Sequence, residues 1–284
     1  MKLNKIADWL YILPALAVIT FIFILPLCYT FWISFQEKVL GGSPKFIGLT
    51  NYYNILASGA FYTIIGNTLV YSFSAVFFKA LIGLAIALLL NRKFPGRGIL
   101  RAYSIIPWAT PAFAVAFFFI LLYDLKGLFN RILGFLGLPA LRYLGPDLAM
   151  FSVIFVNVWR GWPFFFLGFL SGLQAIPQEI YESAEIDGAS RFKKFVYITL
   201  PNLKTVFFTV CLLSLMWTMG DFTTIYLLTK GGPLDKTLTA PIASYLKAFA
   251  TGANIPEAAA LLILLLPIYV ILIYLVMKYA YGRA

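Results

Sequence analysis

The densest group of charged residues in this sequence follows Pro177 and holds four of the chain's eleven acids. The group comprises Glu179, Glu182, Glu185, Asp187, Arg191, Lys193 and Lys194. The sequence contains no His, which is the commonest general base and metal ligand. With the acids confined to loops, the sequence predicts no paired-carboxylate, metal or Ser/His catalytic site. Charge of both signs in one short segment instead indicates a surface that binds another protein on the aqueous side of the membrane.

This charged segment is predicted to form two short helices that meet at Gly188. Pro177 suits the first turn of a helix, and Gly188 favours the left-handed conformation that ends one. Ser190 is a good N-cap for the second helix, which Pro201 is expected to end. The alternative is an amphipathic loop resting on lipid headgroups, but four acids would then face an anionic membrane surface.

The composition identifies the surroundings of this segment. Of the 284 residues, 62% are hydrophobic and only 12% are charged, and the mean hydropathy is +0.89. Soluble domains carry about 25% charged residues, so the chain is predicted to be an integral membrane protein. The net charge of +11 does not indicate nucleic acid binding, because the bases lie scattered between apolar segments. Cys28 and Cys211 lie in apolar stretches and predict no disulfide framework.

Six apolar segments are long enough to cross a bilayer, and they predict a single all-α membrane domain over residues 1–284. They cover residues 10–35, 66–90, 103–123, 148–171, 205–222 and 257–277. The first lacks a signal-peptide cleavage site and is expected to be a retained span. With both termini inside, the inside loops hold more Lys and Arg in fewer residues than the outside loops, which favours an N-in, C-in topology. Segment 175–201, between the fourth and fifth spans, is then cytoplasmic.

The charged segment resembles the cytoplasmic "EAA" motif of bacterial and archaeal ABC-importer permeases, E-A-A-x-x-x-G-x9-I-x-L-P. The matching residues are Glu182, Ser183, Ala184, Gly188, Ile198, Leu200 and Pro201, with Ser183 in place of an alanine. Beyond the motif, nearly the whole chain is similar to carbohydrate-import permeases of the maltose-uptake type, in the MalF- and UgpA-like group. Stretches such as FIGLTNYYNIL, ALLLNRKFPGRGILRAYSIIPWATP and LLTKGGP carry this similarity.

The resemblance implies a multi-pass permease of a prokaryotic cytoplasmic membrane that works with several partners. A second, different permease would complete a heterodimer, two ATPase subunits would dock on the EAA loops, and an extracytoplasmic binding protein would deliver the sugar. ATP and Mg²⁺ would bind to the ATPase subunits, so no cofactor or metal is expected in this chain. Glu182 would make the polar contact with the ATPase, and Gly188 would form the tight turn between the coupling helices.

Two bases, Lys79 and Arg160, lie near the middle of predicted spans. A base at the bilayer centre costs at least about 2.5–3.5 kcal/mol, so each should face the protein interior or a water-filled cavity. Snorkelling to the membrane surface is the alternative, but each base is far from the nearer end of its span. Aromatic faces with a few polar groups commonly hold sugars. The candidate pathway residues are therefore Asn157, Trp159, Arg160, Trp162, Trp217, Asp221 and Lys79.

Two other classes of membrane protein compete with a permease. A secondary, ion-coupled transporter usually needs intramembrane carboxylates, and the predicted spans hold essentially none. An integral membrane enzyme needs a catalytic constellation that the sequence lacks. The chain also lacks the phosphate loop G-x-x-x-x-G-K-[ST], so it is not itself the ATPase. The prediction is therefore a non-enzymatic permease subunit that forms half of the translocation pathway for a sugar or sugar derivative, driven by ATP hydrolysis on partner subunits.

Overall fold

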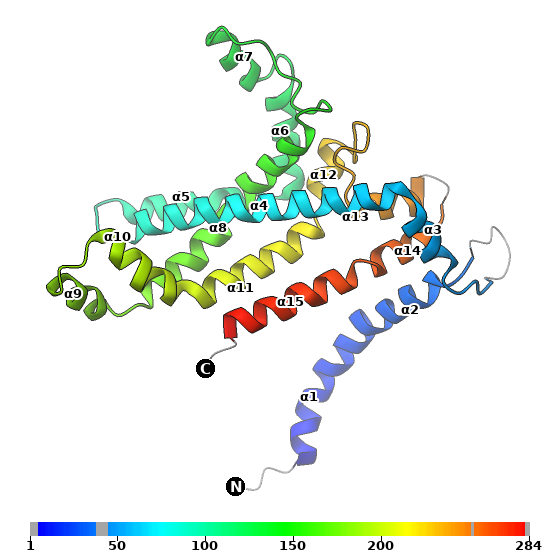
Figure 1. Ribbon diagram of the computed structural model, residues 1–284, viewed down its shortest axis with the longest axis horizontal. Helices are drawn as coiled ribbons and strands as arrows, with labels where there is room; N and C mark the ends of the chain where they lie inside the picture. Colours follow the sequence, from blue (N-terminus) through cyan, green and yellow to red (C-terminus); the bar gives the residue numbers. More distant parts are fainter. Residues whose placement is uncertain (1–4, 38–44, 251–252, 282–284) are drawn as a thin grey trace. The chain divides into compact units, whose positions relative to one another are not determined.

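The computed structural model describes residues 5–37, 45–250 and 253–281, and these residues are helical apart from loops and one antiparallel bridge between Gln36 and Phe46 (Figure 1). The chain divides into two compact units. The first comprises Met1–Tyr62 and Ala243–Leu266, and the second comprises Thr63–Ile242 and Pro267–Ala284.

In the first unit, α14 packs against α2 and α3. The unit contains α1 (Lys5–Ile19), a π-helical turn (Thr20–Ile24), α2 (Leu25–Ser34), α3 (Thr50–Ala57), a second π-helical turn (Leu246–Ala250) and α14 (Ile255–Ile263). The buried amide of Asn51 donates to the backbone oxygens of Ser34 and Gln36, at 2.8 Å each, and so satisfies carbonyls at the end of α2. Asn254 caps α14 by accepting a hydrogen bond from the backbone N–H of Glu257, whose carboxylate pairs with Lys247.

The second unit is built on α4, α8 and α11. Its helices, with those that continue into the first unit, are α4 (Gly59–Asn91), α5 (Arg97–Ala109), α6 (Ala112–Tyr123), α7 (Leu128–Phe135), α8 (Ala149–Gln174), α9 (Gln178–Ile186), α10 (Arg191–Lys194), α11 (Leu200–Met219), α12 (Thr223–Leu228), α13 (Ala240–Tyr245) and α15 (Leu266–Tyr281). Phe165, Phe166 and Phe169 of α8 are fully buried in one cluster with Leu203 and Met219 of α11.

Glycines let the backbones of these helices approach closely. A Cβ atom added at Gly83 of α4 would lie 2.5 Å from Phe165 Cβ and 2.9 Å from the backbone nitrogen of Phe166. A Cβ atom at Gly168 would lie 2.6 Å from Val210 Cγ1 of α11. Small residues at helix crossings allow the close van der Waals packing that holds membrane helices together. The crossings of α8 with α4 and α11 therefore depend on glycine.

Within the described residues, six helical segments are long and apolar enough to cross a membrane, in agreement with the predicted all-helical fold class. They are Tyr11–Ser34, Gly59–Asn91, Ala112–Phe135, Ala149–Gln174, Arg191–Met219 and Ile255–Tyr279.

The third segment differs from the predicted span 103–123. The helix is interrupted at Thr110, whose ψ of 131° is extended, and α6 begins after Pro111. Proline disfavours the helical conformation in the residue before it, so α5 and α6 are separate helices. The apolar segment that starts at α6 then runs on to Phe135.

The fifth segment also corrects a prediction, because Pro201 does not end the second helix of the charged segment. The chain stays helical from Arg191 through a π-helical turn, Phe195–Thr199, into α11, where Pro201 is the second residue. The π-helical turn Thr20–Ile24 stands in the same relation to Pro26 of α2. A wider turn gives the proline ring room beside the preceding carbonyls, so the helix continues.

Candidate functional site

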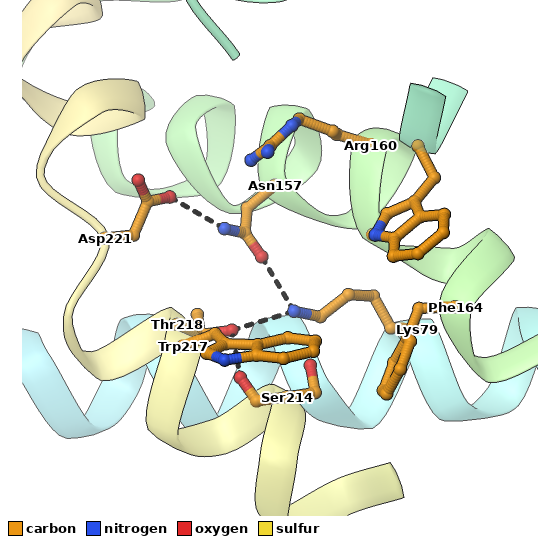
Figure 2. Close-up of a pocket in the computed structure, with 10 residues that line it drawn as sticks. Lys79, Asn157, Arg160, Phe164, Ser214, Trp217, Thr218 and Asp221 are labelled. Carbon is orange, nitrogen blue, oxygen red and sulfur yellow. Dashed lines mark hydrogen bonds between the residues drawn. The ribbon is translucent and has the colours of Figure 1, made fainter. Parts of the chain in front are cut away.

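A cavity of about 260 Å³ lies within the second unit, among α4, α5, α8 and the end of α11 (Figure 2). It is lined by Lys79, Trp108, Asn157, Arg160, Gly161, Phe164, Ser214, Trp217, Thr218 and Asp221. Charged and amide groups lie on one part of its wall and aromatic rings on another. A small cavity of mixed polarity between membrane helices is a candidate binding site, because its polar groups can orient a ligand while its rings cover it.

Lys79 is held inside the unit by hydrogen bonds. Its side chain is only 3% exposed, and its Nζ donates to Asn157 Oδ1 at 2.9 Å and to Thr218 Oγ1 at 2.8 Å. Its aliphatic stem lies against Gly161, where an added Cβ atom would come within 2.5 Å of Lys79 Cδ. Lys79 therefore does not snorkel to the membrane surface. It joins α4 to α8 and α11, as Figure 2 shows.

Asp221 completes this network from just beyond α11. Its Oδ2 accepts hydrogen bonds from Tyr71 Oη at 2.7 Å and from Asn157 Nδ2 at 2.8 Å, and its Oδ1 accepts from the backbone N–H of Thr224. Asn157 turns its carbonyl to the lysine ammonium and its amino group to the carboxylate. Both of its hydrogen bonds are therefore assisted by charge, which makes them stronger than neutral ones. The buried cation is balanced by an anion through one bridging amide.

Arg160 is the second cation of the cavity, and it stands outside this network. Its Nε is buried and has no hydrogen-bond partner among the described residues. A buried polar group without a partner is costly and requires an explanation. Because Arg160 lines the cavity, its guanidinium is available to a ligand with hydrogen-bond acceptors.

Three aromatic rings cover another part of the cavity wall. The rings of Phe164 and Trp217 have centroids 5.0 Å apart, and Trp108 lies 6.1 Å from Phe164. Trp217 is 57% exposed, although it sits on a helix of the core. Such rings offer flat apolar faces beside the polar groups of Asn157 and Asp221.

The structure gathers five of the seven predicted pathway residues at this cavity: Lys79, Asn157, Arg160, Trp217 and Asp221. Trp159 instead packs on Phe119, with centroids 5.5 Å apart, and Trp162 packs on Phe166, at 6.3 Å.

Sequence reasoning missed the other five lining residues: Trp108, Gly161, Phe164, Ser214 and Thr218. A usable signal existed for two of them. Ser214, Thr218 and Asp221 are spaced at i, i+4 and i+7, which places polar groups along one face of an apolar helix.

The segment 175–201 forms two helices joined by a turn, which agrees with part of the predicted geometry. α9 ends at Ile186, Gly188 has a φ of +75°, and Ser190 Oγ accepts from the backbone N–H of Lys193 at 3.3 Å. Across the turn Lys194 pairs with Glu185, and the hydrogen bond from the ammonium lowers the pKa of that carboxyl. Gly188 is needed here because residues with a Cβ disfavour positive φ.

The motif residues are distributed along this turn. Glu182, Ser183 and Ala184 lie on α9, Ile198 lies in the π-helical turn, and Leu200 and Pro201 begin α11. None of the residues of α9 is buried.

Two side chains on this segment show how open its surface is. The Glu182 carboxylate accepts only from Gln178 Nε2, at 2.8 Å, among the described residues. Ile186, at the end of α9, is 87% exposed. An exposed apolar residue and a carboxylate that forms no ion pair among the described residues leave this surface available to a partner.

The chain's similarity to known proteins agrees with this architecture. Residues 79–283 match the family described as "Binding-protein-dependent transport system inner membrane component". The chain is 42% identical over 240 residues to the trehalose/maltose transport system permease protein MalF of Thermococcus litoralis, over 84% of this chain and 81% of that protein. It is 29% identical over 278 residues to the sn-glycerol-3-phosphate transport system permease protein UgpA of Salmonella typhi, over 97% of this chain and 94% of that one.

A solved structure is similar over the full length. It is the crystal structure of a bacterial alginate ABC transporter in complex with an alginate pentasaccharide-bound periplasmic protein. The match has a TM-score of 0.84 at 22% identity and covers 100% of this chain and 99% of that one, so the two share a fold. The predicted resemblance to MalF- and UgpA-like permeases is confirmed. The chain belongs to the family of inner membrane components of binding-protein-dependent transport systems.

Proposed function

We propose that this permease forms one half of the pathway by which a sugar or oligosaccharide enters the cell, and that residues 1–284 act as one transmembrane domain. As a multi-pass inner membrane component of an ABC importer, the chain is the permease and not the ATPase. The names of its relatives support a carbohydrate cargo, since one is a trehalose/maltose permease at 42% identity. Because the chain belongs to this family of ABC importer components, the alternative of an ion-coupled secondary transporter is no longer supported.

The observation that carries the proposal is that the two cations lining the cavity differ in their hydrogen bonding. Lys79 is already satisfied by Asn157 and Thr218, whereas Arg160 Nε has no hydrogen-bond partner in the part of the chain that the structure describes. Rings of Trp108, Phe164 and Trp217 lie beside it. A sugar presents acceptor oxygens at its edges and C–H groups on its faces, so it suits one free guanidinium and neighbouring rings. Arg160 is therefore the cation that contacts the cargo, and Lys79 is the cation that stabilises the wall of the cavity.

Segment 175–201 is proposed to be the site where an ATPase subunit docks, on the cytoplasmic side of an N-in, C-in topology. Support comes from the exposed acids and apolar residues of α9 and from the sharp turn at Gly188. A rigid helix pair of this kind can carry movement of an attached subunit into α11, with which it is continuous. The full importer would contain a second, different permease, two ATPase subunits and an extracytoplasmic binding protein.

The experiment is to express the chain together with candidate permease, ATPase and binding-protein subunits from the same organism. If the proposal is correct, the subunits co-purify, and the binding protein loaded with sugar stimulates vanadate-sensitive ATPase activity. A panel of maltose, trehalose, arabino-oligosaccharides and glycerol 3-phosphate tests the cargo. Stimulation by glycerol 3-phosphate alone would contradict a sugar cargo while leaving the permease assignment intact.

A further inference from the structure

A second and larger hollow of the second unit lies away from the cavity. It is a groove of about 1100 Å³ between the α4–α5 connector and the α9–α10 turn, which lie at the same end of this unit in Figure 1. Five bases line it together with one acid. They are Arg92, Lys93, Arg97, Arg191 and Lys194, with Glu185 as the acid.

The groove carries a large excess of positive charge. Glu185 pairs with Lys194, and in the part of the chain that the structure describes no ion pair forms at the other four bases. Bases that only set membrane orientation can lie anywhere in the inside loops. Here the connector and α10, which are far apart in the sequence, instead bring their bases together around one concave surface. Such a surface has a strong attraction for an anion.

The walls of the groove are partly apolar. Leu88 at the end of α4 and Leu173 at the end of α8 line it, together with Ile176 and Phe195. Leu88, Leu173 and Phe195 lie at the ends of helical segments that are long and apolar enough to cross a membrane, and Ile176 follows two residues after α8. A free phosphate ion has no use for an apolar wall, whereas a phospholipid places glycerol and acyl carbons directly beside its phosphate.

We propose that this groove binds the headgroup of an anionic phospholipid, such as phosphatidylglycerol. Basic pockets between membrane helices are suited to anionic headgroups, since each base near the membrane surface adds to the attraction. The phosphate interacts with the unpaired bases of the connector and α10, and the acyl chains leave along the apolar ends of α4 and α8. The bound lipid links the α4–α5 connector to the turn proposed to couple ATP hydrolysis, but its binding does not depend on the cargo.

The test uses the complete permease–ATPase complex in detergent, titrated with phosphatidylglycerol or with phosphatidylcholine while thermal stabilisation is measured. The variant Arg92→Gln/Arg97→Gln removes two bases of the groove. Lys126→Gln/Arg142→Gln is the matched control, because it removes two exposed bases outside the groove. We expect phosphatidylglycerol to bind about fivefold more weakly for each base removed from the groove, and about 25-fold more weakly to the double variant. Binding to the control should equal that of the wild type, and Arg92→Lys should retain most of it.

Three results would overturn the proposal. One is equal phosphatidylglycerol affinity in the groove variant and the wild type. Another is displacement of the lipid by an equal concentration of inorganic phosphate, which would make the ligand a free anion. The third is binding that appears only when the ATPase subunits are removed, which would make the occupant a protein. If Arg92→Gln/Arg97→Gln unfolds, the single variant Arg191→Gln tests the same groove from the α10 side.

Discussion

Lys79 and Arg160 bring the same charge to one cavity, but their partners differ. Lys79 has two hydrogen bonds and an anion one amide away, whereas the buried Nε of Arg160 has no partner among the described residues. Arg160 is half-buried, and a buried N–H group without a hydrogen-bond partner adds nothing to the stability of the fold. The difference separates a residue that stabilises the helices from one that is available to cargo.

We predict that Lys79→Met lowers the stability of the complex, whereas Arg160→Gln weakens transport of the cargo. Lys79→Met leaves Asn157 and Thr218 without their donor, so it should cost about 1–3 kcal/mol of stability and lower the melting temperature of the complex. Arg160→Gln breaks no described hydrogen bond and should leave that temperature nearly unchanged. It should raise the KM for uptake about tenfold to a hundredfold, because a charged hydrogen bond to cargo is lost. Normal KM in Arg160→Gln would contradict its assignment.

A double-mutant cycle tests whether Lys79 and Asp221 act as a pair. Asp221→Asn alone leaves the Lys79 charge buried without its anion and should destabilise the complex. Adding Lys79→Met should destabilise it by less than the sum of the two single changes, with a coupling of about 0.5–3 kcal/mol, because the network is shared through Asn157. The measurement is the melting temperature of the four complexes. Simple additivity would show that the bridge contributes nothing.

Sequence analysis predicted those site residues whose types are unusual in an apolar helix. Charges and tryptophans stand out in an apolar helix, which is why Lys79, Arg160 and Asp221 were found. Trp159 and Trp162 share the helix of Arg160 but pack on Phe119 and Phe166, because helical rotation turns neighbouring residues to different faces. Trp108 joins the cavity through packing of α5 against α8. A contact between helices cannot be read from the spacing within either one.

At the scale of elements, the turn between α9 and α10 depends on one backbone conformation. Gly188 has a φ of +75°, and no atom lies within 4 Å of where its Cβ would be, so only the backbone conformation restricts substitution. Proline fixes φ near −65° and cannot adopt this turn.

We therefore predict that Gly188→Pro uncouples the importer, so that ATP hydrolysis no longer drives sugar uptake. Gly134→Ala is the matched control, since this glycine is also open and lacks a positive φ. Uptake and ATPase activity are measured together in proteoliposomes. Wild-type uptake by Gly188→Pro at normal expression would count against a coupling role for the turn.

Glu182 tests the docking surface without disturbing the fold. It is exposed on α9 and its one described partner is Gln178. Glu182→Lys should therefore leave the melting temperature of the permease unchanged but reduce co-purification of the ATPase and abolish coupled uptake. Glu179→Lys, an exposed acid on the same helix outside the motif, serves as the control. Equal loss in both variants would indicate a general charge effect and not a specific contact.

Element boundaries were less predictable than element existence. Apolar length alone indicates six spans, because a bilayer demands about 20 apolar residues for each helix. It does not reveal that Pro111 separates α5 from α6, or that Pro201 lies inside a continuous helix. The two prolines also differ in their surroundings, since a π-helical turn precedes Pro201 but not Pro111. That turn depends on the backbone path through Phe195–Thr199, which hydropathy does not record.

At the scale of the whole molecule, the chain combines the cavity proposed to bind cargo with the turn proposed to bind an ATPase subunit. The cavity and the turn at Gly188 belong to the same compact unit, and α11 reaches from the one to the other. Movement imposed at the turn can therefore reach Thr218 and Asp221 through one helix and the loop that follows it. Energy from ATP must enter through a partner, because the sequence has no phosphate loop of its own.

The most direct test of this account is uptake of labelled maltose or trehalose into proteoliposomes that contain this permease, its partner permease and the ATPase subunits. We expect uptake that requires the binding protein and ATP, stops with vanadate and persists when proton and sodium gradients are dissipated. Flux through this chain alone that is driven by an ion gradient and indifferent to ATP would contradict it.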